Sequence, residues 1–174
     1  MQTSKKKEYG LVIFFVLFIA SAAFFIAKDH AQLQTVVSKE QLLLGDEDFI
    51  VKVGPNDLFI GSSTREEVLK MLPRGKTLGM STIYKPESPD CLLTFNEDEE
   101  ILQKIHIYNQ DIQTKRGAKV GDAFTLVTEK YGPNYSSVGY PGKAKDFDAV
   151  YGAGNNIIFQ VRDDKVKTII LQKE

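Results

Sequence analysis

Helix signals occur twice in this chain, 60 residues apart, and this spacing constrains its fold more than any other feature. In residues 60–73, Ser63 followed by Glu66 fits a capping box, in which each side chain satisfies a free backbone N–H at the helix start. A proline ends this helix. A gapless shift of 60 places Gly61 on Gly121 and the terminating proline on a second proline. The chain therefore predicts two helices with the same start and stop signals.

Similar short apolar segments follow each helix and indicate a repeated unit. We expect Asp122 to cap the second helix, and Gly132 with Pro133 to end it. Short strands and a charged turn come after both helices, so the sequence predicts a tandem duplication, with repeat 1 at 49–110 and repeat 2 at 111–174. The expected fold class is α+β: one antiparallel sheet with the helices on one face, preceded by a single N-terminal transmembrane helix.

An apolar segment at residues 9–27 indicates a membrane-directing leader. It has no formally charged side chain, and as a helix it spans ~28 Å, close to the ~30 Å hydrocarbon core of a bilayer. Three lysines precede it, so the positive-inside rule places residues 1–8 in the cytoplasm as a basic tail. We therefore expect a single-pass protein of the cell membrane, whose extracytoplasmic part begins with a stalk or linker at 28–48.

Two other interpretations of this leader stay open. Its basic start and the small residues between Ala20 and Ala23 also fit a signal peptide, whose cleavage would give a secreted protein. Against cleavage, Phe24, Phe25 and Ile26 continue the apolar run beyond those small residues. A buried helix of a soluble protein is the third interpretation.

Charge and cysteine content argue against several classes of function. Without residues 1–27, 19 basic and 22 acidic side chains remain, and a net charge of −3 does not suit a nucleic-acid-binding surface. Cys91 is the only cysteine, so no intramolecular disulfide forms, and its apolar surroundings predict a small buried side chain. His30 and His106 lack metal-ligand spacing, and no nucleophile motif occurs. We therefore expect no enzymatic activity, no cofactor and no metal.

Alternation within two predicted strands indicates a sheet face that suits protein recognition. Successive side chains of a strand point to opposite faces. The sets expected to pack under the helices are Ile101, Ile105 and Ile107 in the first strand and Ile157, Phe159 and Val161 in the second. The sets expected on the free face are Lys104, His106 and Tyr108, and Ile158, Gln160 and Arg162. Tyr and Arg are enriched at interface hot spots, but an ordinary solvated sheet face explains this pattern equally well.

Two kinds of surface segment are also predicted. The acidic runs at 46–48 and 97–100 lack the ligand pattern of a calcium-binding loop, and we expect them to be solvated turns. Residues 134–156 form a long connection rich in glycine, tyrosine and lysine, which is either mobile or a binding loop. Its tyrosines, Tyr135, Tyr140 and Tyr151, are candidates for contacts with a partner.

The two copies share an order of glycine, helix, stop signal and short strands, marked by Gly61, Val68 and Pro73, then Gly121, Val127, Gly132 and Pro133. This order resembles the outer-membrane assembly lipoprotein BamE (the SmpA/OmlA family). The doubled arrangement is similar to the tandem-repeat β-lactamase inhibitor protein fold, and to secreted Gram-positive proteins of unknown function. No lipid-attachment cysteine follows the leader, and Leu72 stands where the second copy has the glycine before its proline.

These observations predict a membrane-anchored, extracytoplasmic scaffold or protein-binding module of the bacterial cell envelope. Its partner would be another envelope or secreted protein, its membrane contact would be the N-terminal helix, and it would bind no nucleic acid. The first alternative is an inhibitor of an extracellular hydrolase, such as a β-lactamase or a cell-wall enzyme. The second is a sensor of a small ligand or of peptidoglycan.

Overall fold

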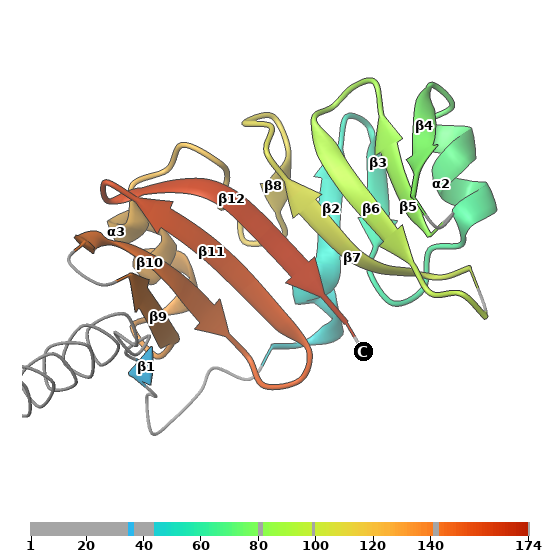
Figure 1. Cartoon of the computed structure of the whole chain (residues 1–174). Coiled ribbons are helices and arrows are strands. Elements are labelled where there is room, and N and C mark those ends of the chain that lie inside the picture. The colour runs from blue at the N-terminus through green and yellow to red at the C-terminus, as the bar shows by residue number, and fades with distance from the viewer. Residues whose placement is uncertain (1–34, 37–43, 80–81, 99, 141–142, 174) are drawn as a thin grey trace, which may run out of the picture. The chain divides into compact units, whose positions relative to one another are not determined.

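A computed structural model describes residues 35–36, 44–79, 82–98, 100–140 and 143–173 (Figure 1). Residues 34–174 form one compact unit. The predicted leader at 9–27 lies outside the described residues. Within the described ranges, no helix combines the length and apolar character that crossing a membrane requires.

The described part of the chain is mostly β. It contains a short 3-10 helix, η1 (Asp46–Phe49), and two short α-helices, α2 (Arg65–Met71) and α3 (Phe124–Tyr131). The strands of its first half are β1 (Thr35–Val36), β2 (Ile50–Val53), β3 (Asn56–Phe59), β4 (Gly75–Leu78), β5 (Ile83–Pro86), β6 (Cys91–Phe95) and β7 (Leu102–Ile107). Those of its second half are β8 (Gln113–Thr114), β9 (Ser136–Tyr140), β10 (Lys143–Tyr151), β11 (Asn156–Arg162) and β12 (Lys165–Gln172).

These strands form two antiparallel sheets in the described part of the chain. The large sheet has nine strands in the order β1-β9-β10-β11-β12-β7-β6-β5-β4, and the small sheet has three in the order β3-β2-β8. Figure 1 shows the large sheet in front, with α3 and the small sheet behind it. The side chains between these layers are the core. One row of it crosses five neighbouring strands of the large sheet, where Leu93, Ile105, Leu171, Ile157 and Tyr151 are all fully buried.

The predicted fold class is wrong. We expected an α+β tandem duplication with one sheet covered by helices, whereas the described residues are mostly β and form two sheets. The physical reason is that the two α-helices are too short to cover one face of the large sheet. Nine strands ~4.8 Å apart make a sheet ~38 Å wide, and helices of seven and eight residues are only ~10–12 Å long. The small sheet covers the remainder with buried side chains such as Val51 and Leu58.

The predicted domain boundaries do not coincide with the strand pairing. Strands on either side of the expected boundary at 110/111 pair with each other, β12 with β7 and β8 with β2. The expected linker at 28–48 contains β1, which pairs with β9, and most of η1. In the described residues, ordered structure therefore begins earlier than the sequence indicated.

The first helix starts one residue later than predicted. Thr64, not Ser63, is the N-cap residue of α2: its hydroxyl accepts a hydrogen bond from the Glu67 N–H (3.3 Å), and the Glu67 carboxylate accepts one from the Thr64 N–H (2.9 Å). Ser63 is buried, and its hydroxyl accepts a hydrogen bond from the Phe59 N–H. The capping box is present, in a register shifted by one residue.

The second helix is not capped as predicted. Its N-cap residue is Ala123, which makes no side-chain cap. The Asp122 carboxylate instead accepts a hydrogen bond from the Lys119 N–H (3.1 Å) and lies 3.6 Å from the Lys130 ammonium. Gly132 ends the helix with φ at 82°, as its position indicated, because glycine adopts this conformation without a Cβ clash.

A buried ion pair joins η1 to the turn before α3. The Asp48 side chain is 2% exposed, and its two oxygens lie 2.6 and 2.8 Å from Nε and Nη2 of Arg116. The guanidinium also lies over the Tyr131 ring, 4.9 Å from its centroid, and the carboxylate raises the pKa of Arg116 by hydrogen bonding. The expected solvated turn at 46–48 is therefore wrong for Asp48.

Candidate functional site

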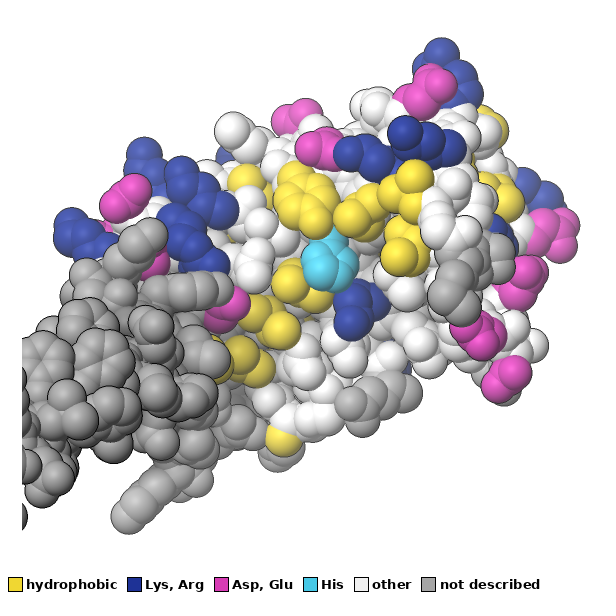
Figure 2. All heavy atoms as spheres, in the orientation of Figure 1, with side chains coloured by type: hydrophobic (Ala, Val, Ile, Leu, Met, Phe, Trp, Pro, Cys, Tyr) yellow, Lys and Arg dark blue, Asp and Glu magenta, His cyan; other side chains and the backbone are white. Residues whose placement is uncertain are grey.

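The candidate site is the face of the large sheet that points away from the core, called the open face below. Five residues, one from each of five neighbouring strands, lie opposite one another as cross-strand partners. Their side chains all point to the open face. This apolar row consists of Leu92, His106, Ile170, Ile158 and Val150. At ~4.8 Å between strands the row is ~19 Å long. Figure 2 shows hydrophobic side chains on both sides of the histidine on this face.

Four predicted partner-binding residues lie on the open face, and a fifth lies beside it. Lys104 is two residues from His106 on β7, while Gln160 and Arg162 alternate with buried residues on β11. Tyr108 directly follows β7, is 37% exposed, and its ring centroid lies 6.4 Å from that of His106. The structure thus brings together residues that the two strand patterns predicted separately.

Some polar side chains of the open face already bind one another. Asp148 of β10 lies 2.9 Å from the Arg162 guanidinium and accepts a hydrogen bond from the Gln160 amide (3.3 Å). Arg162 also donates hydrogen bonds to the backbone carbonyls of Phe147 and Val161. These contacts hold the Arg162 guanidinium in place at the border of the face. Its charge is already paired with Asp148, so we do not count it as a cation available to a partner.

Two of the predicted tyrosines of 134–156, Tyr135 and Tyr151, do not belong to this site. The segment is not a long loop, because most of it forms β9 and β10, which pair with each other. Tyr151 is fully buried and its hydroxyl donates a hydrogen bond to the Gly132 carbonyl (2.9 Å), so it cannot reach a partner. Tyr135 is half-buried between Phe124 and Phe147. The side chain of Tyr140 lies outside the described residues.

Sequence reasoning missed most of the apolar row. Ile158 and His106 were placed on the free face, whereas Leu92, Ile170 and Val150 were not singled out. Alternation in residues 91–95 was an available signal, because Cys91, Leu93 and Phe95 are buried and Leu92 and Thr94 are not. A bulge between Lys104 and Leu102 also makes Leu102, rather than the predicted Ile101, the inward residue.

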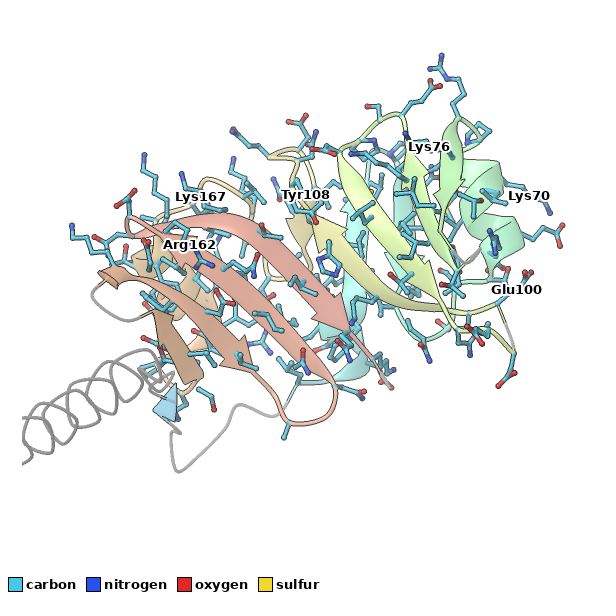
Figure 3. All side chains as sticks on the ribbon, in the orientation of Figure 1. Lys70, Lys76, Glu100, Tyr108, Arg162 and Lys167 are labelled. Atoms are coloured by element: carbon cyan, nitrogen blue, oxygen red, sulfur yellow. The ribbon has the colours of Figure 1, made fainter. Side chains whose placement is uncertain are left out.

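Five lysines lie near the apolar row. Lys104 lies beside it, Lys76 and Lys85 face each other on β4 and β5, and Lys165 and Lys167 lie on β12. In Figure 3, Lys76, Tyr108 and Lys167 follow one border of the molecule, and Figure 2 shows basic side chains bordering the hydrophobic band. The open face therefore has an apolar centre with lysines, interspersed with acidic side chains, along its edges.

His106 should make stability depend on pH. Burial, and secondarily the charge of Lys104, lower its pKa from the ordinary 6.5. The unfolded chain then binds a proton that the folded chain does not, so stability is complete above the unfolded pKa and falls as pH drops from 6.5 towards the folded pKa. Urea denaturation at neutral pH and at pH ~5 should show a smaller loss of stability in His106→Gln than in the parent protein. An equal loss in both proteins would contradict this.

Cys91 is confirmed as a small buried side chain. It is fully buried, and burial raises the pKa of its thiol to about 12. Because the thiolate is the reactive form, we expect iodoacetamide at neutral pH to leave Cys91 unmodified in the folded protein and to alkylate it fully in urea. Intact-mass measurement detects the added group, and rapid alkylation without urea would show that the strand opens.

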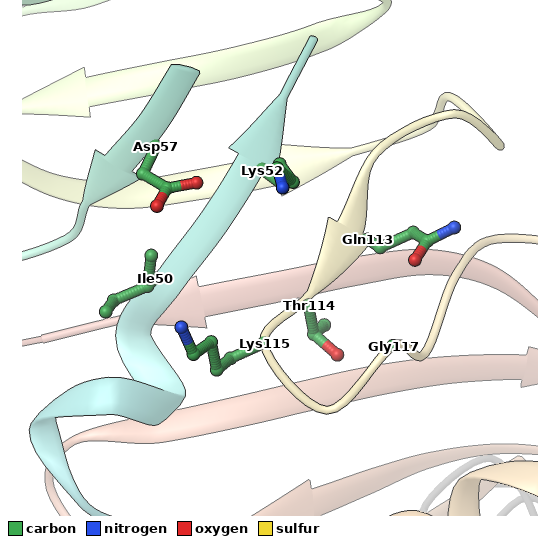
Figure 4. A pocket seen from close by; sticks show the side chains of 7 residues that line it. All are labelled: Ile50, Lys52, Asp57, Gln113, Thr114, Lys115 and Gly117. Atoms are coloured by element: carbon green, nitrogen blue, oxygen red, sulfur yellow. The ribbon is translucent and has the colours of Figure 1, made fainter. Parts of the chain in front are cut away.

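A second feature is a hollow of about 230 Å³ on the small sheet (Figure 4). Its lining residues are Ile50, Lys52, Asp57, Gln113, Thr114, Lys115 and Gly117. The hollow holds charges of both signs and is smaller than the ~300–1,000 Å³ of most small-molecule sites, so we assign it no ligand. Among the described residues, no three His, Cys, Asp or Glu side chains are grouped as metal ligands would be.

In comparisons with known proteins, no family model, curated protein or solved structure matches this chain. The resemblance to BamE and to β-lactamase inhibitor proteins therefore stays a prediction.

Proposed function

We propose that this protein is a membrane-anchored, extracytoplasmic binding module of the bacterial cell envelope, which captures another envelope or secreted protein on its open face. The observation that carries the proposal is the apolar row, which lies on the outer face of the large sheet and stays partly exposed there except at Ile170. Protein interfaces characteristically have an apolar centre that excludes water and a polar border. Anchoring by residues 9–27 is supported by the length and flanking charges of the leader.

Three exposed large hydrophobic residues provide a sharp test. Tyr108 lies beside the apolar row, whereas Phe59 on β3 and Leu126 on α3 have similar exposures, 43% and 40%, on other elements. The photocrosslinking amino acid p-benzoylphenylalanine would replace each residue in turn in the tagged full-length protein. After irradiation of native membranes, we expect a specific protein adduct from position 108 and none from positions 59 or 126.

The outcomes have distinct meanings. Adducts at all three positions, or at 59 and 126 alone, would contradict binding at the open face. The mass of the protein recovered from membranes reports whether the leader is retained. The identity of the adduct separates the alternatives, because an extracellular hydrolase would indicate an inhibitor, and an envelope assembly component would indicate a scaffold.

A further inference from the structure

We infer that the partner presents an acidic surface with apolar side chains at its centre, and that lysines at the edges of the open face recognise it. This inference rests on the proposed function and specifies the chemistry of the partner. Its basis is the charge distribution around the apolar row. The recognising set, called the basic rim below, consists of Lys76, Lys104, Lys165 and Lys167.

Some cationic side chains near the open face are already neutralised by ion pairs within the protein, and others are not. Arg162 pairs with Asp148 at 2.9 Å, and Lys85 pairs with Asp90 at 3.3 Å. No lysine of the basic rim makes an ion pair with another described residue. The charges of these four lysines are thus not neutralised by ion pairs with other described residues.

This charge is opposite in sign to that of the chain beyond the leader. Residues 28–174 carry a net charge of −3, whereas the basic rim places four lysines without ion-pair partners among the described residues around one face. Segregated charge of this kind steers a complementary partner and repels surfaces of the same sign. A second copy of this chain would place its own basic rim against the first, so the open face is unsuited to symmetric self-association.

The shape of the apolar row favours a protein over a membrane or a charged polymer. Ile170 is only 9% exposed, and Leu92, Ile158 and Val150 are half-buried in the pleated surface, so they do not project as membrane-inserting side chains do. A polyanion such as polyphosphate has no apolar groups with which to cover them. An acidic polypeptide surface matches both the rim and the row.

The test uses a random 12-residue peptide library displayed on phage and panned against the full-length protein in detergent micelles. We expect the selected peptides to be enriched in Asp and Glu combined with apolar residues. Lys104→Glu with Lys167→Glu should weaken their binding roughly tenfold, and so should raising the salt concentration well above physiological. Lys52→Glu with Lys115→Glu is the matched control, because it makes the same charge change on the small sheet.

Three results would overturn the inference. They are selected peptides without an excess of acidic residues, equal losses in the rim and control variants, and binding of phosphatidylglycerol bicelles or polyphosphate as tight as that of the peptides. The proposed function is judged separately. Capture at position 108 in native membranes that survives the Lys104→Glu, Lys167→Glu change would leave the function standing and reject the acidic partner. Selection of acidic peptides without any adduct at position 108 would support the surface chemistry and reject the function.

Discussion

Replacing Arg116 with alanine is expected to lower the free energy of unfolding by about 3–5 kcal/mol, because it leaves a buried carboxylate without its cation. The Asp48 side chain is 2% exposed, and beyond Arg116 its oxygens accept a hydrogen bond from the Gly45 N–H (3.0 Å). The loss includes the contact of the guanidinium with the Tyr131 ring. Urea denaturation followed by circular dichroism measures the effect, with an unchanged slope showing that only stability changed.

Two further variants make this prediction specific to the buried pair. Arg74→Ala removes an arginine whose side chain is 85% exposed and lies 3.9 Å from Glu87, so it should cost less than about 1 kcal/mol. Asp48→Leu combined with Arg116→Met removes both charges and should recover much of the loss, since apolar replacements of a buried ion pair are often tolerated. A loss below about 1 kcal/mol in Arg116→Ala would show that the site readily rehydrates.

Local features of this fold could be predicted from the sequence, and long-range pairings could not. The alternation of β11 correctly separated Phe159, which is buried, from Gln160, which is not. Likewise, the end of α3 was identified because Gly132 and the proline after it are local signals. Each of these predictions depends only on residues within a few positions of one another, where side-chain spacing directly reports the backbone conformation.

The second sheet had no comparable signal. Its strand β8 has two residues, Gln113 and Thr114, too few for an alternating pattern, and it pairs with Val51 and Lys52 more than 60 residues away. The partner of Asp48 is equally distant in the chain. Such pairings follow from the packing of the whole core, which a local pattern does not specify.

The β9–β10 hairpin was mistaken for a loop for a different reason. Its glycine and tyrosine content is typical of exposed connections, but Gly139 lies within β9 and Tyr151 packs against Tyr131 and Phe159. Composition therefore suggested surface binding for a tyrosine that belongs to the core. The same hairpin helps to form the open face, since Val150 of β10 pairs with Ile158.

Gly152→Ala is the second substitution with a large expected effect, because it combines backbone strain with a collision. Gly152 follows β10, has φ at 85°, and a Cβ built there would lie 2.4 Å from the Asn155 carbonyl oxygen and 2.8 Å from a Leu44 methyl. Positive φ costs a residue with a Cβ ~1–2 kcal/mol, and overpacking typically costs another ~1–3 kcal/mol. We therefore expect a loss of roughly 2–5 kcal/mol in urea denaturation.

Gly54→Ala separates these two contributions. Gly54 also has a positive φ, 61°, but a Cβ there would meet nothing within 4 Å, so only the strain of about 1–2 kcal/mol applies. If both substitutions cost the same, the turn after β10 must relax away from Asn155 without loss. If Gly152→Ala costs more, the difference measures how rigidly the turn is held. A rigid turn would fix the adjacent ends of β10 and β11, and with them the positions of Val150 and Ile158 in the apolar row.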